Sequence, residues 1–272
     1  MEIIKKDFNR QTNIASKYDR ILAEYNLDIT DEEVKSAVKK IIVERVAEND
    51  TLEVKKFLLS CIELTSLRTI DTEESILAMT EKVNRFDSLY PGLPHVAAIC
   101  AYPCFTKLIA ESLEVDGVDI TNVCGSFPSS QTFLEVKTIE TALAIKDGAT
   151  HIDIVLPVGK FLSGDYESVF DTISELKQIC GEIPMKVILE TGDLGGFRNI
   201  KTAALLSMYA GADYVKTSTG KEKISATPES VYVMCQAIKE YHVKTGVQIG
   251  LKPAGGINTV MDAIIYYSIF KE

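Results

Sequence analysis

The sequence predicts an α/β protein that folds as a TIM (β/α)8 barrel with an N-terminal helical extension. Short apolar runs alternate with helical patterns from about residue 57 onward. Successive runs lie roughly 32 residues apart, close to the repeat of a barrel of this size. Several runs are apolar without alternation, as is typical of parallel strands covered on both faces. A doubly wound open sheet has a similar repeat, but its Gly-x-Gly-x-x-Gly turn does not follow the first run.

Residues 1–50 are expected to form the helical extension, and residues 51–272 the barrel domain. Within the extension, Ile29–Ile42 has a helix-capping residue at Thr30, acidic residues in the next turn and apolar residues at helical spacing. This segment is therefore predicted as a helix that precedes the barrel.

Seven strands, with helices between them, are predicted in the rest of the chain. The predicted strands are Phe57–Leu64, His95–Tyr102, Asp119–Gly125, His151–Pro157, Met185–Thr191, Asp213–Ser218 and Gln248–Pro253. The predicted helices include Glu135–Asp147, Tyr166–Cys180, Asn199–Ala210 and Ser230–Tyr241. Gly148 and Gly211 mark turns that end a helix and lead into the next strand.

The same spacing places the eighth strand roughly at residue 282, beyond Glu272. The last segment, Thr259–Lys271, is predicted as the helix after strand seven. The barrel domain is therefore expected to be C-terminally incomplete, with strand eight missing. An open barrel, or one closed by other means, is the alternative. We expect a chain that continues past Glu272 in preference to a natural seven-stranded barrel.

The composition restricts the classes of partner. A net charge of −10 argues against non-specific nucleic-acid binding, which needs a basic surface. It leaves a small anionic substrate possible, because a few local lysines can outweigh a distant negative surface. The start of the chain has no apolar signal-peptide region, and no apolar run approaches the ~20 residues of a membrane span. We expect a cytoplasmic protein without membrane contact, and the sequence is compatible with a homo-oligomer.

The cysteines and histidines do not predict a metal site or thiol catalysis. Most of the six cysteines lie in apolar runs, which suits reduced, buried thiols. Cys100 and Cys104 form a C-x3-C pair without a second pair or a His-x3-His, so no metal is expected. Of the three histidines, His95 and His151 open strands and His242 follows a helix. They are expected at the wrong end of the barrel to activate a cysteine.

Two lysines lie in apolar, strand-like runs where a lysine is costly. Lys216 follows Asp213-Tyr-Val, and Lys252 follows Ile249-Gly-Leu. Burial disfavours the charged form of a lysine, so the pKa of each is expected to fall, and a second nearby cation would lower it further. An amine made neutral in this way is a nucleophile suited to Schiff-base chemistry. A single lysine in such a run more often lies at a strand end and reaches solvent. Two such lysines, each followed by small residues, favour a functional site.

The other candidates lie at the strand ends where a barrel builds its active site. Asp153, flanked by apolar residues, is expected to be buried and to pair with a lysine, either as a structural ion pair or as the acid and base of the reaction. The remaining polar candidates are Glu63, Thr65, Cys100 and Glu190. Cys100 is expected to be a core thiol close to the site.

Two turns after strands six and seven are candidates for phosphate binding. Lys216–Lys221 carries hydroxyls, a glycine and a second lysine, and Pro253–Gly256 carries two glycines. Small residues allow backbone amides to approach an anion, and the late loops of TIM barrels often bind phosphate. The first turn is not a Walker A loop, because Glu222 stands where Ser or Thr should be.

These residues resemble those of deoxyribose-phosphate aldolases, which are class I aldolases. The resemblance runs from about Cys61 to Tyr267 and rests mainly on Val215-Lys-Thr-Ser-Thr-Gly-Lys221 and Gly250-Leu-Lys-Pro-Ala-Gly-Gly256. Ala97–Pro103, the Asp153-Ile-Val segment and Glu190-Thr-Gly support it. The helical extension is similar to that of the larger form of the family.

The resemblance implies reversible cleavage of 2-deoxy-D-ribose 5-phosphate to glyceraldehyde 3-phosphate and acetaldehyde, without metal or cofactor. Lys216 matches the Schiff-base lysine, Lys252 the lysine that lowers its pKa, and Asp153 the acid/base carboxylate that works with a water. The residues expected to bind the substrate are Thr65, Cys100, Thr217, Thr219, Gly220, Lys221, Gly255 and Gly256.

The chain departs from the family pattern in two places. Glu63 stands where the family usually has aspartate, and the strand-eight loop that supplies more of the phosphate site is absent. These departures leave two alternatives open: a catalytically impaired relative that acts as a binding protein, and a Schiff-base lyase for another phosphorylated aldehyde.

Overall fold

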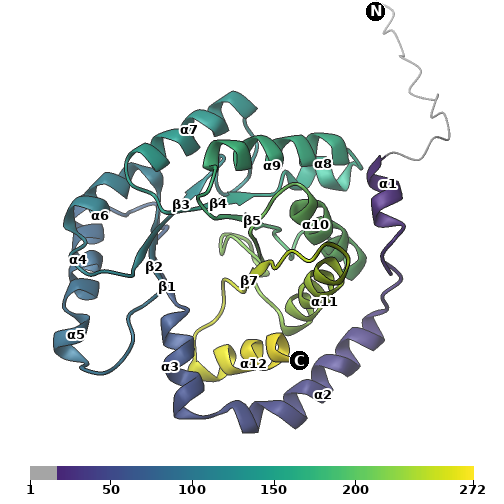
Figure 1. Cartoon of the computed structure of the whole chain (residues 1–272), viewed down its shortest axis with the longest axis horizontal. Helices are drawn as coiled ribbons and strands as arrows, with labels where there is room; N and C mark the ends of the chain where they lie inside the picture. Colours follow the sequence, from purple (N-terminus) through teal and green to yellow (C-terminus); the bar gives the residue numbers. More distant parts are fainter. Residues whose placement is uncertain (1–16) are drawn as a thin grey trace, which may run out of the picture.

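The computed structural model describes residues 17–272 and contains a curled sheet of seven parallel strands (Figure 1). Each strand pairs with the next one along the chain, in the order β1 to β7. The strands are β1 Glu63–Thr65, β2 Ala98–Ala101, β3 Asp119–Cys124, β4 His151–Val155, β5 Met185–Ile188, β6 Tyr214–Lys216 and β7 Gly250–Lys252. This arrangement confirms the α/β barrel class. Within the described residues no eighth strand joins β7 to β1.

Helices cover the outside of the sheet, as expected of parallel strands buried on both faces. Those before and between the early strands are α1 Lys17–Leu22, α2 Asp31–Asn49, α3 Leu52–Ser60, α4 Glu73–Asn84, α5 Phe86–Leu89, the 3₁₀ turn η1 Pro103–Phe105 and α6 Thr106–Ser112. The later ones are α7 Leu134–Lys146, α8 Val158–Leu162, α9 Tyr166–Cys180, α10 Phe197–Tyr209, α11 Pro228–Thr245 and α12 Val260–Lys271. The helices predicted from periodicity are confirmed, with ends shifted by a few residues.

The prediction for the first strand was wrong over most of its length. Phe57–Leu64 was expected to be extended, but α3 runs to Ser60 and only Glu63–Thr65 is strand. Thr51 caps α3, since its side chain accepts a hydrogen bond from the Val54 amide at 3.2 Å. The capped segment is rich in leucine and lysine, which favour helix, and this local preference decides the outcome.

The strand register places several polar side chains in one row of the barrel interior. Asp153 on β4 pairs with Lys186 on β5, which pairs with Tyr214 on β6, which pairs with Gly250 on β7. Register partners in parallel strands point to the same side of the sheet. Gly250 is required in this row, because a Cβ atom there would collide with the Tyr214 ring.

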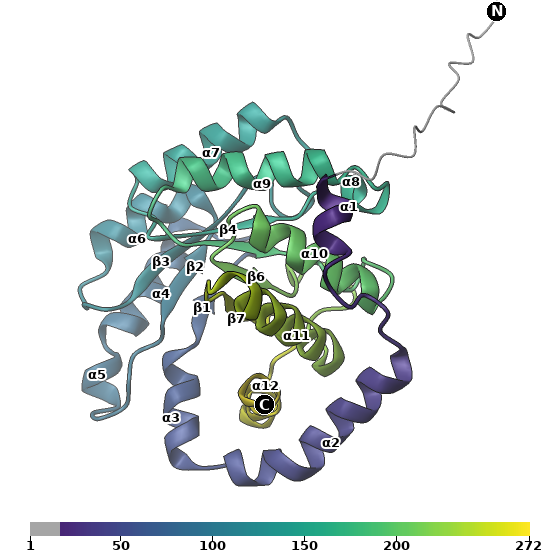
Figure 2. The ribbon, with the colours of Figure 1, turned by 45° about the vertical axis from the view of Figure 1, so that its right-hand side comes forward.

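The open side between β7 and β1 is covered by helices rather than by a strand (Figure 2). The C-terminal helix α12 packs against α2, α3 and α11. Asn49, the last residue of α2, is buried, donates a hydrogen bond to Ser268 at 2.9 Å and accepts one from Lys271 at 3.0 Å. Polar contacts between helices therefore hold α12 in place on this side.

The N-terminal helices wrap around the outside of the barrel. Thr30 caps α2, as the sequence predicted, and the structure adds a complete capping box with Glu33. The buried ammonium of Lys201 on α10 donates to the carbonyl of Asn26 and to Glu240, both at 2.7 Å, and so ties the segment between α1 and α2 to the barrel. Residues 1–16 of the predicted extension lie outside the described residues, and the boundary at residue 50 remains a prediction.

The main apolar core lies between the sheet and the later helices, with contributions from α1 and α2. None of the helices in residues 17–272 is long and apolar enough to cross a bilayer.

Candidate active site

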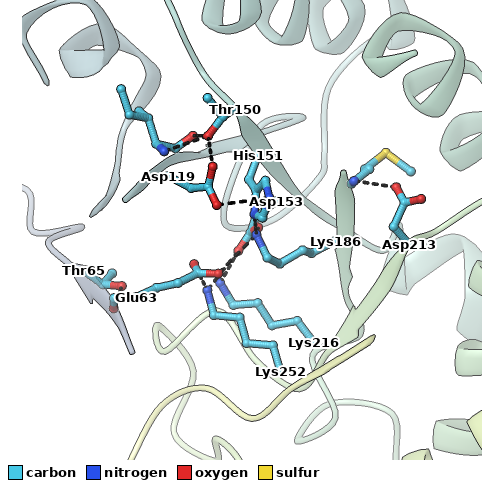
Figure 3. A network of polar contacts seen from close by, with 12 residues as sticks. Glu63, Thr65, Asp119, Thr150, His151, Asp153, Lys186, Asp213, Lys216 and Lys252 are labelled. Atoms are coloured by element: carbon cyan, nitrogen blue, oxygen red, sulfur yellow. Dashed lines mark hydrogen bonds and ion pairs between the residues drawn. The ribbon is translucent and has the colours of Figure 1, made fainter. Parts of the chain in front are cut away.

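Lys216, Lys252 and Asp153 meet inside the barrel, as the sequence predicted (Figure 3). Lys216 and Lys252 are register partners on β6 and β7. The Lys216 Nζ lies 2.6 Å from Asp153 Oδ2, and the Lys252 Nζ lies 3.5 Å from the same oxygen. The Asp153 side chain is fully buried and that of Lys216 only 5% exposed, so the contact is shielded from water. One carboxylate oxygen thus lies between two lysines.

Two further charged residues complete the cluster (Figure 3). Glu63 on β1 forms an ion pair with Lys252 through Oε2, and its Oε1 lies 3.2 Å from the ammonium of Lys186. Lys186 on β5 also lies 3.1 Å from Asp153 Oδ1. The cluster therefore contains three lysines and two carboxylates, and the Glu63–Lys252 pair joins the two strands that border the open side.

At Asp153, Lys186 and Lys252 the neighbouring opposite charges favour the charged form more than burial disfavours it. Burial works to raise the pKa of Asp153, but Lys216, Lys252 and Lys186 hold that pKa far below its ordinary value. Burial works to lower the pKa of Lys252, but Asp153 and Glu63 raise it above its ordinary value. The balance at Lys186 has the same direction, and its pKa is raised.

The expectation of a lowered pKa for Lys252 was therefore wrong. Sequence reasoning counted burial and a neighbouring cation, but not the two carboxylates that contact this side chain. Lys252 is a charged residue in this site, and it brings a positive charge close to Lys216.

Cys100 lies beside the lysines, on β2, as a fully buried thiol. Burial raises its pKa, although Lys216 and Lys252 act in the opposite direction. One ligand atom from each of Cys100, Glu63 and Asp153 lies within 4.8 Å of the other two. The carboxylates of Glu63 and Asp153 already form ion pairs with lysine ammonium groups. The positive charge that they bind in this structure therefore comes from the protein's own lysines. The absence of a metal from the reaction remains a prediction.

The turn after β6 is ordered by a buried glutamate. Glu190, two residues after the end of β5, adopts a left-handed φ of 54°. Its carboxylate accepts hydrogen bonds from the Thr219 amide at 3.2 Å and from the Thr219 hydroxyl. Burial raises the pKa of Glu190. Both donors of Thr219 therefore serve this contact, and a role of Thr219 in substrate binding remains a prediction.

The turns after β6 and β7 are joined to each other. The Thr217 hydroxyl donates to the Ala254 carbonyl at 3.1 Å and accepts from the Ala254 amide at 2.9 Å. Gly220, Gly255 and Gly256 all adopt left-handed φ angles, and a Cβ at Gly255 would lie 2.5 Å from Ser225 Oγ. The glycines thus allow two tight turns to pack together at the end of the barrel where Lys216 and Lys252 lie.

Two predicted substrate residues lie at the edge of this site. The Lys221 ammonium donates to the carbonyl of Leu67, and so connects the turn after β6 to the segment after β1. Thr65, at the end of β1, is exposed and donates to the carbonyl of Glu63 at 2.8 Å. The structure places both near the open side, and their contact with a substrate remains a prediction.

Sequence reasoning missed Lys186, the third lysine of the cluster. It lies in the predicted strand Met185–Thr191, and its side chain is only 3% exposed. The signal that identified Lys216 and Lys252, a lysine inside an apolar strand-like run, was also present there. Sequence reasoning also placed His151 away from the chemistry, whereas its ring contacts Lys186 at 3.0 Å.

Comparison with known proteins agrees with this site. The family model described as DeoC/LacD family aldolase matches residues 66–268. The deoxyribose-phosphate aldolase of Bos taurus is 38% identical over 224 residues, which are 79% of this chain and 70% of the relative. The deoxyribose-phosphate aldolase of Homo sapiens is 38% identical over 221 residues, 78% of this chain and 70% of the relative.

A solved structure shares both the fold and the sequence pattern. It is the deoxyribose phosphate aldolase of Aeropyrum pernix, described as a tetramer. It matches with a TM-score of 0.67 and 26% identity over 89% of this chain and 91% of that chain. On the family match and the length of the shared sequence, this chain belongs to the DeoC/LacD family of aldolases.

Proposed function

We propose that this protein reversibly cleaves 2-deoxy-D-ribose 5-phosphate to D-glyceraldehyde 3-phosphate and acetaldehyde through a Schiff base on Lys216. The observation that carries the proposal is the buried Asp153 carboxylate held between Lys216 and Lys252. The names of the relatives supply the substrate, and the cluster supplies groups suited to the chemistry.

Lys216 acts first as the nucleophile. It passes a proton to its nearest acceptor, Asp153 Oδ2 at 2.6 Å, and the free amine adds to the aldehyde carbon of the open-chain sugar. Loss of water from the resulting carbinolamine gives an iminium, with the departing hydroxyl taking a proton from the Asp153 carboxylic acid. The Lys252 ammonium contacts the same Asp153 oxygen at 3.5 Å, and it assists Lys216 in the role that the family resemblance gives it.

The iminium then accepts the electron pair of the bond that breaks. The hydroxyl on the third carbon gives up its proton to the Asp153 carboxylate, the bond between the second and third carbons breaks, and glyceraldehyde 3-phosphate leaves. The electron pair becomes an enamine, which takes a proton at the second carbon. Hydrolysis of the new iminium releases acetaldehyde and returns the Lys216 amine. Asp153, whose Oδ2 contacts Lys216, is the group that moves protons at the imine nitrogen and its neighbouring carbons.

The phosphate is proposed to bind at the paired turns after β6 and β7. Backbone amides at Gly220, Gly255 and Gly256 and the Lys221 ammonium are the groups suited to an anion there. Gly220 and Gly256 have open space where a side chain would lie, so the backbone there can approach an anion, which supports this assignment. We also propose that the protein acts in the cytoplasm, and as a homo-oligomer.

Trapping the Schiff base tests the assignment of Lys216. The protein is incubated with 2-deoxyribose 5-phosphate and borohydride, and the modified peptide is identified by mass spectrometry. We expect a reduced adduct on Lys216 that is absent from Lys216→Ala. The exposed Lys223, on the same loop, provides the matched control, and Lys223→Ala should keep the adduct. An adduct of unchanged yield in Lys216→Ala would overturn the assignment.

Turnover with other substrates separates the two alternative functions. Preference for a ketone donor, or for another phosphorylated aldehyde, would replace the proposed reaction by a related Schiff-base lyase. Formation of the trapped adduct without turnover of any substrate would favour an impaired relative that binds its ligand. Glu63 is the residue to exchange in that case, because Glu63→Asp restores the residue usual in the family.

A further inference from the structure

His151 contacts the catalytic cluster from the layer below it. It is the first residue of β4 and lies two positions before Asp153, so both side chains point to the same face of the strand. Its side chain is 19% exposed, and its Nδ1 lies 3.0 Å from the Nζ of Lys186 (Figure 3). The histidine is at the opposite end of β4 from the reaction, but the length of Lys186 bridges the two layers.

The contacts of Lys186 determine which form of His151 fits. An ammonium has three N–H donors and no acceptor. Lys186 Nζ is surrounded by Asp153 Oδ1 at 3.1 Å, Glu63 Oε1 at 3.2 Å and His151 Nδ1 at 3.0 Å. His151 Nδ1 must therefore offer a lone pair, and the proton of the neutral ring is on Nε2. That nitrogen faces Asp119 Oδ2 at 3.7 Å.

Charged groups from several strands act on the ring. Lys186 on β5 opposes its protonation, whereas Asp119 on β3, Glu63 on β1 and Asp153 on β4 favour it. The Tyr214 ring of β6 lies 6.4 Å away between centroids. Burial has the largest effect and Lys186 the next, so the pKa of His151 lies below its ordinary value. The ring is therefore neutral at neutral pH and able to accept from Lys186.

We propose that His151 is a positioning residue for the catalytic cluster, whose neutral ring holds the Lys186 ammonium against Asp153 and Glu63. Protonation of the ring places an N–H on Nδ1, directly against the ammonium. Lys186 then loses its acceptor and faces a second cation, and it withdraws from the two carboxylates. For its effect on rate, this inference rests on the proposed aldolase function. The contact itself does not depend on that function.

The consequence is a loss of activity on the acid side of neutrality. The ordinary pKa of a histidine is about 6.5. Because the pKa of His151 is lowered, its ring is still mostly neutral at that pH and becomes charged only when the pH falls further. Withdrawal of Lys186 leaves Asp153 with only Lys216 and Lys252 as cationic partners among the described residues. The Asp153 carboxylate, which transfers the protons of the reaction, then changes its position and loses one neighbouring positive charge. We therefore expect kcat to fall.

A proton NMR titration tests the contact without using activity. The chain has three histidines, and His151→Gln identifies the signal of His151. We expect this signal to titrate below the ordinary histidine value, and to move upward by about one pH unit in Lys186→Met, where the repelling cation is absent. An unchanged titration in Lys186→Met would overturn the proposal, whatever reaction the protein catalyses.

The pH dependence of kcat/KM tests the effect on catalysis. In His151→Asn the amide oxygen takes the place of Nδ1 and still accepts from Lys186 but does not titrate, so the acid loss should disappear and the rate at neutral pH should stay within a factor of about three. In His151→Leu no acceptor remains, and we expect a loss of roughly tenfold at every pH. The exposed His242 provides the control, since His242→Gln should keep the wild-type profile. An acid loss retained in His151→Asn, or equal rates in the Asn and Leu variants, would overturn the positioning role.

Discussion

The charge cluster extends across two parts of the barrel that are built differently. Asp153, Lys186 and Lys216 lie on β4, β5 and β6, which are hydrogen-bonded to neighbours on both sides. Glu63 and Lys252 lie on β1 and β7, which border the open side and are connected to each other by an ion pair. In the first part the backbone positions the charges. In the second part the charges also help to position the backbone, so removing one should affect structure as well as chemistry.

Removal of Asp153 should produce the largest effect. Asp153→Leu leaves three lysines in the barrel interior with Glu63 as their remaining carboxylate partner in the described cluster, and we expect a loss of about 3–5 kcal/mol in the free energy of unfolding. Asp153→Asn keeps the shape and should cost less, while also abolishing turnover. Urea denaturation of both variants measures the difference. Equal stability of Asp153→Leu and the wild type would show that the carboxylate does not hold the lysines together.

The same carboxylate should make stability depend on pH in a defined range. The folded-state pKa of Asp153 is lowered from its ordinary value of 3.8, so its contribution is fully present above that value and is lost as the pH falls below it. The stability difference between the wild type and Asp153→Asn should therefore be constant at neutral pH and shrink below about pH 4. Thermal denaturation of both proteins from neutral to acid pH provides the measurement, and a difference that grows towards acid would contradict the assignment.

Exchange of Glu63 tests the open side. Glu63→Gln removes the charge that pairs with Lys252 and Lys186, and we expect a loss of about 1–3 kcal/mol. Glu63→Asp keeps the charge but shortens the reach by one methylene, so it should retain contact with one lysine rather than both. Denaturation and turnover of the two variants should separate the effect of charge from the effect of reach. Identical behaviour of both variants would show that reach does not matter here.

The smallest effect is expected at the helix that covers the open side. Asn49→Ala removes the hydrogen bonds to Ser268 and Lys271, with an expected cost of about 1–2 kcal/mol. Hydrogen exchange should quicken in α12 and stay unchanged in the hydrogen-bonded strands β3 to β5. Quickening throughout the barrel would show that the open side is not an independent unit.

The sequence allowed good prediction wherever the signal was local. Thr30 and the acidic residues after it predicted the start of α2, and the spacing of apolar runs predicted seven parallel strands in the part of the chain that the structure describes. Lys216, Lys252 and Asp153 were recognisable because a charge in an apolar strand is costly wherever it occurs. Lys186 carries the same signal, but it lies near the start of its strand and not at the end where a barrel builds its active site.

Contacts between distant residues were not predictable in this way. The pair Glu63–Lys252 forms only because the sheet curls until its first and last strands face each other, and no local pattern encodes that curvature. The direction of the pKa shift of Lys252 depends on this contact, and it was therefore predicted wrongly. Similarly, the capture of Thr219 by Glu190 depends on a turn geometry that the composition of the loop does not reveal.

The fit of Tyr214 against Gly250 has a consequence for how this sequence can diverge. The phenol ring fills the volume that a side chain at position 250 would need, so the two positions share one space in the barrel interior. A larger residue at 250 can be accepted only if residue 214 becomes smaller at the same time. Related sequences should therefore exchange volume between these two sites, and a designer who alters one of them has to alter the other.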